Sequence, residues 1–283
     1  MRCFGGTIGF HSHVSDALGG LEARFGVFVP DGINAASPAP ALYALGGLTS
    51  NEETFATKSG VLRFAAEHRL VMVFPDTSPR GAGVPGEDTD WDFGTGAGFY
   101  LDATEPPWSA HYRMGTYVND ELPALIEANF PVRPARRGIM GHSMGGYGAL
   151  TLALRDPARW HSVSAFAPIC YPSDVPWGQK AFPAYLGSDR AGWAAHDPTL
   201  LLRAGHVHPT TLLIDQGEAD QFLGQQLRPD SLEQAASDAG QLLTLRRHVG
   251  YDHSYWFIQS FIADHIEHHA RLLQPDGPVR VPG

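Results

Sequence analysis

A five-residue motif with a serine at its centre constrains the fold of this chain most strongly. The sequence Gly-His-Ser-Met-Gly occupies residues 141–145, directly after a strand-like run at 137–140 and directly before a helix-like run at 144–155. A serine at a strand-to-helix reversal has a strained backbone, so the residues two positions away on each side must lack side chains that would collide. Gly141 and Gly145 satisfy this condition, and the motif therefore predicts a nucleophile elbow that carries Ser143.

The helix that follows the motif supports a catalytic interpretation. A helix that begins at Met144 directs unsatisfied amides and the positive end of its dipole towards the Ser143 oxygen, where negative charge would develop during acyl transfer. Chance Gly-x-Ser-x-Gly sequences are common in glycine-rich chains, and this one has 32 glycines. The position of the motif between a strand and a helix favours the functional interpretation.

The rest of the chain alternates between strand-like and helix-like segments. Runs rich in β-branched and aromatic residues, typical of strands, span 25–30, 41–45, 71–74, 137–140, 163–167, 211–214 and 243–249. Helix-like stretches span 51–68, 116–128, 144–155, 231–239 and 254–273. Repeated strand-then-helix order predicts a mostly parallel central sheet flanked by helices. We therefore predict one α/β domain over residues 1–283, with the α/β-hydrolase fold.

One long segment, residues 77–112, has no predicted helix or strand. Loops of this length are usually functional or disordered. This one carries six glycines and several large aromatic residues, and we expect the aromatic residues to pack against the domain: Trp91, Phe93, Phe99, Tyr100 and Trp108.

Composition excludes several classes of partner. No apolar run approaches the length needed to cross a bilayer. The net charge of −10 disfavours nucleic acid and anionic membranes as partners, because both require a basic surface. Residues 1–16 lack the apolar stretch of a signal peptide, which predicts a cytoplasmic location in which Cys3 and Cys170 stay unpaired. We expect a small-molecule substrate, and a homodimer is left open.

Three histidines near the end of the chain raise the question of a metal site. His265, His268 and His269 are three or four residues apart in a predicted helix, a spacing that also occurs in metal sites. Apolar residues at helical spacing, among them Ile262 and Ile266, instead predict that the histidines lie on the solvent-facing side of a terminal helix. We therefore predict no metal ion and no cofactor.

A serine nucleophile needs a base and an orienting carboxylate, which follow it in the order acid, then histidine. The strand-like run 211–214 leads into a loop with three acids, Asp215, Glu218 and Asp220. We favour Asp220 as the orienting carboxylate. Asp215, at the end of the strand, is expected to accept hydrogen bonds from local backbone amides, and Glu218 is expected to be solvated.

The histidine is expected after the last strand. His253 lies between the strand-like run 243–249 and the final predicted helix, and we predict that it is the base. His248 lies inside the strand run, where the pleat fixes its direction, so a core or edge position is predicted. The glycine-rich turn after 41–45 offers a second oxyanion donor, and the amides of Leu48 and Met144 form the predicted pair. The alternative is that the glycines of this turn only permit a tight bend.

Several further motifs resemble S-formylglutathione hydrolases, the esterase D family, over most of the chain. The elbow is common to many esterases, whereas the segments around Trp91 and Trp177 are specific to this family. The matching segments are residues 2–6, 47–49, 91–100, 141–146, 167–170, 176–182, 215–217, 220–223 and 252–255.

The resemblance implies hydrolysis of S-formylglutathione to formate and glutathione, with Ser143, Asp220 and His253 as the triad and Leu48 and Met144 as oxyanion donors. It also implies that Trp177 lines the acyl pocket. A broad-specificity carboxylesterase or an acyltransferase of the same fold is the alternative, and a catalytically inactive binding module is disfavoured because all three triad positions are filled.

One position departs from the family pattern, and one contact is left undetermined. Many members have a cysteine directly after the Gly-Leu-Thr segment, whereas this chain has Ser50. This difference predicts weak inhibition by thiol-alkylating reagents. Lys58 and Lys180 are candidate partners for the carboxylates of glutathione, although solvated lysine is the more common state.

Overall fold

The computed structural model describes residues 1–274, and a nine-stranded sheet forms the centre of this region. The strands are β1 (Arg2–Cys3), β2 (Gly6–Ser15), β3 (Leu21–Pro30), β4 (Ala39–Leu45), β5 (Val71–Pro75), β6 (Val132–His142), β7 (Val163–Phe166), β8 (Leu212–Gly217) and β9 (Leu243–His248). They are ordered β1-β2-β3-β5-β4-β6-β7-β8-β9 across the sheet. The pairs β1/β2, β2/β3 and β3/β5 are antiparallel, and all other pairs are parallel.

All seven predicted strands are confirmed, and β1 and β2 are strands that the sequence analysis missed. In β4, β5, β7 and β8 every residue is buried, as strands covered on both faces require. β2 pairs along its whole length with β3. Its histidines, serines and glycines interrupt the usual apolar alternation, and the strand lies near the edge of the sheet.

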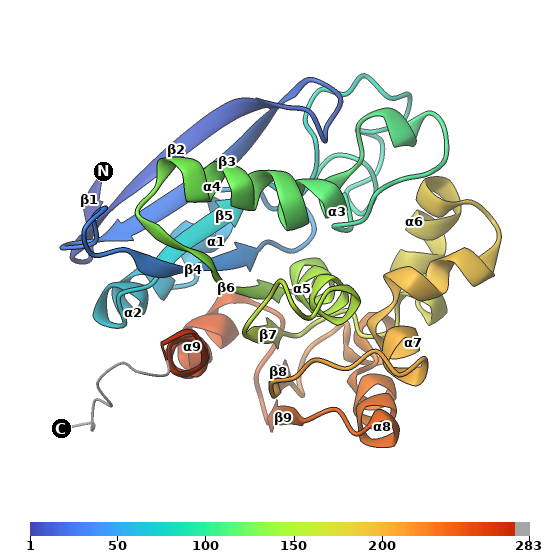
Figure 1. Ribbon diagram of the computed structural model, residues 1–283. Helices are drawn as coiled ribbons and strands as arrows, with labels where there is room; N and C mark the ends of the chain where they lie inside the picture. The colour runs from blue at the N-terminus through green and yellow to red at the C-terminus, as the bar shows by residue number, and fades with distance from the viewer. Residues whose placement is uncertain (275–283) are drawn as a thin grey trace.

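Helices cover both faces of the sheet. They are α1 (Thr54–Lys58), α2 (Val61–Glu67), α3 (Met114–Thr116), α4 (Leu122–Asn129), α5 (Met144–Arg155), α6 (Pro176–Leu186), α7 (Pro198–Arg203), α8 (Pro229–Ala239) and α9 (Tyr255–Leu273). α2 and α9 pack together on one face, while α4 and α5 lie on the other (Figure 1). α7 lies against both α5 and α8. The single-domain α/β fold with a mostly parallel sheet is therefore confirmed, and residues 275–283 of the predicted domain lie outside the described residues.

Two predicted helices are divided. The stretch 51–68 forms α1 and α2, which are separated at Ser59 and Gly60. The stretch 116–128 begins as α3, continues as a π-helical turn at Tyr117–Glu121 and ends as α4. Two helices, α6 and α7, were not predicted; each begins at a proline in a segment without a clear periodic pattern.

The predicted solvent-facing position of the α9 histidines is wrong. His265 and His269 are fully buried, and His268 is 6% exposed. His265 and His269 lie at the same helical spacing as Ile258, Ile262 and Ile266, so they belong to the stripe that packs on β6, β7 and β8. The spacing of the apolar residues did not reveal this, because Ser162 and Ser164 offer the histidines polar partners opposite α9.

The buried histidines of α9 form a continuous chain of hydrogen bonds with two serines. His265 Nδ1 lies 2.8 Å from Ser164 Oγ, and Ser164 Oγ lies 2.8 Å from His269 Nε2. His269 Nδ1 lies 2.6 Å from Ser162 Oγ. Burial lowers the pKa of both histidines, so both are neutral in the folded protein at neutral pH.

The long loop over 77–112 packs against the domain, as predicted. Within it, a short 3-10 helix at Trp108–Ala110 is the only helix or strand that the structure describes. Phe93 stacks on Tyr185 of α6 with 4.9 Å between ring centroids, and Trp108 contacts both rings. Trp91 differs from the other aromatic residues because 57% of its surface is exposed.

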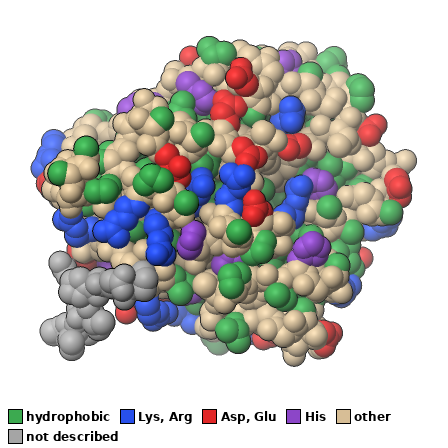
Figure 2. All heavy atoms as spheres, viewed as in Figure 1, with side chains coloured by type: hydrophobic (Ala, Val, Ile, Leu, Met, Phe, Trp, Pro, Cys, Tyr) green, Lys and Arg blue, Asp and Glu red, His purple; other side chains and the backbone are tan. Residues whose placement is uncertain are grey.

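The surface carries both signs of charge. Figure 2 shows acidic and basic side chains intermixed over one face of the molecule, in a chain whose net charge is −10. None of the helices in residues 1–274 has the length and apolar character that a bilayer crossing requires.

Candidate active site

The predicted site residues lie at one edge of the sheet. Ser143 follows β6, Asp220 follows β8 and His253 follows β9, each at the carboxyl end of a parallel strand. The register brings these ends level: His142 of β6 pairs with Phe166 of β7, and Phe166 pairs with Asp215 of β8. Gly217 of β8 in turn pairs with His248 of β9. Loops that leave neighbouring parallel strands at the same edge meet there, which is where open α/β sheets bind ligands.

Ser143 lies on a strained turn between β6 and α5. Its backbone angles are φ 58° and ψ −118°, outside the regions that most residues adopt. A Cβ atom at Gly141 would lie 2.2 Å from the Gly145 carbonyl oxygen, and one at Gly145 would lie 2.1 Å from that of Leu45. Both glycines are therefore required by close backbone packing, as the motif predicts.

Asp220 and His253 form a short hydrogen bond. His253 Nδ1 lies 2.6 Å from Asp220 Oδ2. The other oxygen of Asp220 accepts a hydrogen bond of 2.8 Å from the Phe222 amide, and Gln216 Nε2 donates to Oδ2 at 3.3 Å. An ionised carboxylate can only accept, so the proton of neutral His253 resides on Nδ1 and leaves Nε2 as an acceptor.

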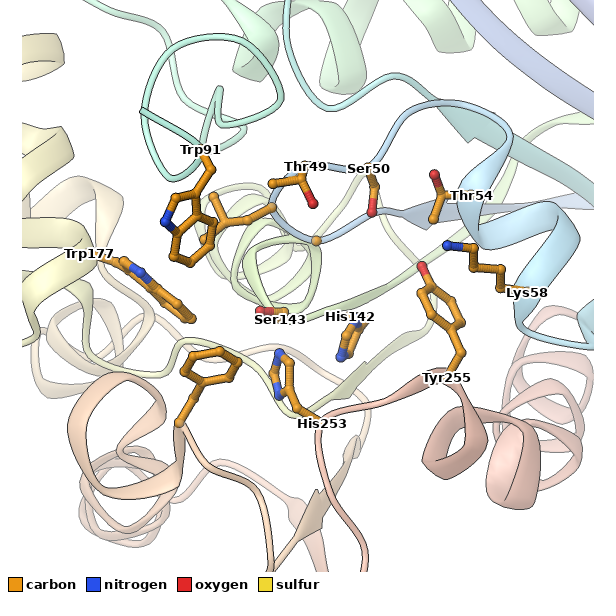
Figure 3. A pocket seen from close by; sticks show the side chains of 13 residues that line it. Thr49, Ser50, Thr54, Lys58, Trp91, His142, Ser143, Trp177, His253 and Tyr255 are labelled. Carbon is orange, nitrogen blue, oxygen red and sulfur yellow. The ribbon is translucent and has the colours of Figure 1, made fainter. Parts of the chain in front are cut away.

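Ser143 and His253 line the same cavity, which has a volume of about 240 Å3 (Figure 3). Ser143 Oγ has no hydrogen-bond partner in residues 1–274, so the structure places the serine and histidine together without joining them. In resting hydrolases this hydrogen bond is often long and tightens when substrate binds. The arrangement can support proton transfer from the serine to the histidine and on to a leaving group.

The turn after β4 lies directly against Ser143. A Cβ atom at Gly47 would lie 3.2 Å from Ser143 Cβ. Within the described part of the chain, the amides of Leu48 and Met144 donate to no carbonyl oxygen. Two free amides beside a serine provide the donors that an oxyanion hole requires.

The long loop supports this turn. Tyr100 donates its hydroxyl proton to the Gly46 carbonyl at 2.8 Å, and the Thr49 amide donates to the Gly96 carbonyl at 3.0 Å. These contacts hold both sides of the turn that carries Leu48. The loop over 77–112 therefore contributes to the geometry of the site as well as to the core.

Asp215 does not bond local backbone amides, so that prediction is wrong. It pairs across β8 and β9 with Arg246, which donates from Nε and Nη2 at 2.6 Å each. His265 Nε2 lies 3.2 Å from Asp215 Oδ2, but the two atoms do not have the geometry of a hydrogen bond. Burial alone would raise the pKa of the Asp215 carboxyl, but His265 and Arg246 lower it below its ordinary value. Glu218 is exposed, as expected.

Aromatic side chains form one wall of the cavity. Trp177, the predicted pocket residue, lines the cavity and is 4% exposed. Its ring centroid lies 4.9 Å from that of Phe222 and 6.0 Å from that of Trp91. Phe222 also meets the His253 ring edge to face at 5.0 Å. Phe222 was not predicted as a lining residue, although its position two residues after Asp220 indicates that it lies near the site.

Polar side chains form the opposite wall. They come from α1, the turn before it and the start of α9 (Figure 3), and they are Ser50, Thr54, Lys58 and Tyr255. Of the two lysines proposed from the sequence, Lys58 therefore lines the cavity. Lys180 instead binds Asp90 at 3.1 Å and also binds Asp92.

A second histidine, His142, lies beside Ser143 and His253 and was not predicted as a site residue. It lines the cavity, is 6% exposed, and its ring centroid is 4.5 Å from that of His253. Burial lowers the pKa of His142 well below its ordinary value, and the neighbouring charge of His253 lowers it further. His142 is therefore a neutral neighbour of His253 at neutral pH.

Neither cysteine lines the cavity, whereas Ser50 does. Both cysteines are unpaired, as predicted. Cys170 is fully buried, and burial raises the pKa of its thiol. In residues 1–274, no three His, Cys, Asp or Glu side chains are grouped as metal ligands would be.

A serine on this elbow in a mostly parallel α/β sheet defines an esterase of the α/β-hydrolase fold. Residues 15–268 match the model of the family described as "Putative esterase". S-formylglutathione hydrolase of Mus musculus is 52% identical over 273 residues, with 96% of each chain covered. The enzyme of the same name from Paracoccus denitrificans is 50% identical over 272 residues, again with 96% of each chain covered.

A solved structure of an S-formylglutathione hydrolase from Agrobacterium tumefaciens is similar over 96% of this chain and 98% of its own. The TM-score is 0.93 and the sequence identity is 49%. The chain belongs to the S-formylglutathione hydrolase family of esterases. The resemblance drawn from the sequence motifs is thereby confirmed.

Proposed function

We propose that this protein hydrolyses S-formylglutathione to formate and glutathione, with Ser143, His253 and Asp220 as its catalytic triad. The observation that carries the proposal is one cavity that holds both Ser143 and His253, with Asp220 hydrogen-bonded behind the imidazole. The names of relatives that are about half identical over nearly the whole chain support the substrate.

Acylation begins when His253 Nε2 takes the proton of the Ser143 hydroxyl. The serine oxygen then bonds to the formyl carbon, and the carbonyl electrons move to oxygen. The amides of Leu48 and Met144 stabilise this oxyanion. Collapse of the intermediate breaks the carbon–sulfur bond, and the glutathione sulfur leaves with the proton held by His253.

Deacylation repeats these steps with water. His253 takes a proton from a water molecule, and the resulting hydroxide attacks the formyl-serine ester. The second intermediate releases formate and returns the proton to Ser143. Neutral His142 contributes no charge of its own beside the imidazolium that forms twice in each cycle.

The aromatic wall fits the smallest acyl group. Trp177 contacts both Phe222 and Trp91, and these three rings line the side of the cavity where we place the acyl group. One additional methyl group in a closed apolar pocket changes specificity by about 10- to 200-fold. Formyl thioesters are therefore the preferred substrates, and small aryl esters are secondary ones.

A comparison of kcat/KM for S-formylglutathione, S-acetylglutathione and 4-nitrophenyl acetate tests the proposal. The expected result is that the formyl thioester exceeds the acetyl thioester by at least about tenfold. Equal or higher values for the acetyl compounds would instead support a broad carboxylesterase or an acyltransferase. Ser143→Ala is the control, and it should abolish turnover of all three compounds.

A further inference from the structure

Lysine is rare in this chain, and one of its two lysines lines the cavity. The chain has 20 basic residues, of which only Lys58 and Lys180 are lysine. Lys180 is paired with Asp90 and Asp92, which flank Trp91 in the sequence. Lys58 has no carboxylate within ion-pair distance in residues 1–274 and is the single Lys or Arg side chain that lines the cavity.

The backbone of Lys58 is fixed while its side chain reaches into the site. Lys58 is the last residue of α1, and its carbonyl oxygen accepts a hydrogen bond of 2.6 Å from Gln259 Nε2 of α9. The same helix is anchored by the fully buried Phe55. The ammonium lies 5.9 Å from the ring centroid of Tyr255, between Thr54 and Tyr255 (Figure 3).

A second polar group in this wall also lacks a partner. The Tyr255 hydroxyl faces Ser50 but forms no hydrogen bond of ordinary geometry with residues 1–274. Burial raises the pKa of Tyr255 to about 12, so the hydroxyl keeps its proton at neutral pH. An ammonium and a hydroxyl that both lack partners on one wall are donors suited to an anion.

The two walls of the cavity match the two ends of a glutathione thioester. The aromatic wall suits the small acyl group, and the polar wall lies on the other side of Ser143 (Figure 3). Glutathione extends from its sulfur as a peptide with two carboxylates. A chain with a net charge of −10 repels such an anion unless a local cation offsets the repulsion.

We propose that Lys58 binds a carboxylate of the glutathione leaving group and thereby selects an anionic peptide thiol over neutral thiols and alcohols. The inference rests on the proposed function, because it assigns the thiol side of the same substrate. Lys58 acts as a specificity residue and takes no part in the proton transfers of the triad.

The first experiment compares Lys58→Gln with the matched control Arg63→Gln. Arg63 is an exposed cation on the neighbouring helix α2 and does not line the cavity, so both variants lose one positive charge. In Lys58→Gln, the ratio of kcat/KM for S-formylglutathione to that for 4-nitrophenyl acetate should fall about 5- to 30-fold, mainly through a higher KM for the thioester. In Arg63→Gln the ratio should stay within about twofold.

A second measurement does not depend on thioester turnover. S-methylglutathione and its dimethyl ester are tested as competitive inhibitors of 4-nitrophenyl acetate hydrolysis by wild type and by Lys58→Gln. The Ki of the acid should rise about 5- to 30-fold in the variant, while the Ki of the diester should change by less than about twofold. This comparison isolates the contact between the lysine and the carboxylates.

The outcomes separate the inference from the proposed function. A wild-type enzyme that fails to cleave S-formylglutathione would refute the proposed function and, with it, the inference. A wild type that cleaves it, together with a Lys58→Gln variant whose substrate ratio and acid Ki are unchanged, would refute the inference alone. An equal loss in Arg63→Gln would also refute it, because the effect would then arise from net charge.

Discussion

Replacing Asp220 by asparagine preserves the size of the side chain but changes what it presents to His253. Asp220 Oδ2 now accepts the Nδ1 proton at 2.6 Å. In the variant, the asparagine carbonyl oxygen can keep the 2.8 Å hydrogen bond that the Phe222 amide donates. The NH2 group of the asparagine then faces His253. The imidazole must then accept at Nδ1 and carry its proton on Nε2, where the base is needed. We expect kcat to fall by about 10³- to 10⁴-fold, with little change in stability.

Asp215→Asn is the matched comparison, because this acid lies in the same segment and is also buried. The change removes the charge that pairs with both nitrogens of Arg246 and contacts His265. Breaking a buried ion pair costs about 3–5 kcal/mol. Arg246 is 31% exposed and keeps Asp264, so we expect a loss of about 2–3 kcal/mol, or about 4–12 °C in Tm.

The two variants therefore separate catalysis from stability. Steady-state hydrolysis of 4-nitrophenyl acetate gives kcat, and thermal unfolding followed by circular dichroism gives Tm. Asp220→Asn should lose activity and keep its Tm, while Asp215→Asn should lose Tm and keep kcat within about threefold at a temperature where it is folded. The reverse pattern would show that Asp215 is the orienting carboxylate and would refute the argument.

Two further predictions concern thiol chemistry and pH. Ser50→Cys should make the enzyme sensitive to N-ethylmaleimide, since residue 50 lines the cavity. Wild type should keep its activity in this reagent, because Cys170 is buried and neither cysteine lines the cavity. Rapid inactivation of wild type would contradict this. Stability to urea should fall between pH 7 and pH 5, because buried His265 and His269 have lowered pKa values and that of His268 is lowered by burial to about 4. At a pH between the ordinary and the lowered pKa of such a histidine, the unfolded chain binds more protons than the folded protein. Each histidine therefore lowers the free energy of unfolding by up to about 1.4 kcal/mol per pH unit as the pH falls. A free energy of unfolding that does not change between pH 7 and pH 5 would contradict this.

The sequence predicted the parts of the fold that depend on local pattern. The apolar runs of β4, β5, β7 and β8 identify buried strands, and the spacing of Gly141 and Gly145 identifies the turn at Ser143. The order of acid and histidine after that turn selected Asp220 and His253, which the structure joins by a hydrogen bond. Their catalytic roles, the cytoplasmic location and the oligomeric state stay predictions.

The features that the sequence did not predict depend on contacts between distant segments. His265 and His269 are buried because Ser162 and Ser164 offer them hydrogen-bond partners and Asp215 lies 3.2 Å from His265, which no pattern within α9 reveals. Asp215 could not be assigned without knowing that it lies opposite Arg246 on β9. The polar wall of the cavity likewise joins α1 to α9, which are about two hundred residues apart in the chain.

The central claim is that the Ser143 hydroxyl is a nucleophile activated by His253. Reaction with a fluorophosphonate, followed by mass spectrometry of the tryptic peptide 138–155, tests it directly, because Ser143 is the only serine in that peptide. The account predicts one phosphonate per chain on this peptide, loss of activity in step with labelling, and labelling slowed by about 10³-fold or more in His253→Gln. Labelling of another residue, or an unchanged labelling rate in His253→Gln, would contradict the claim.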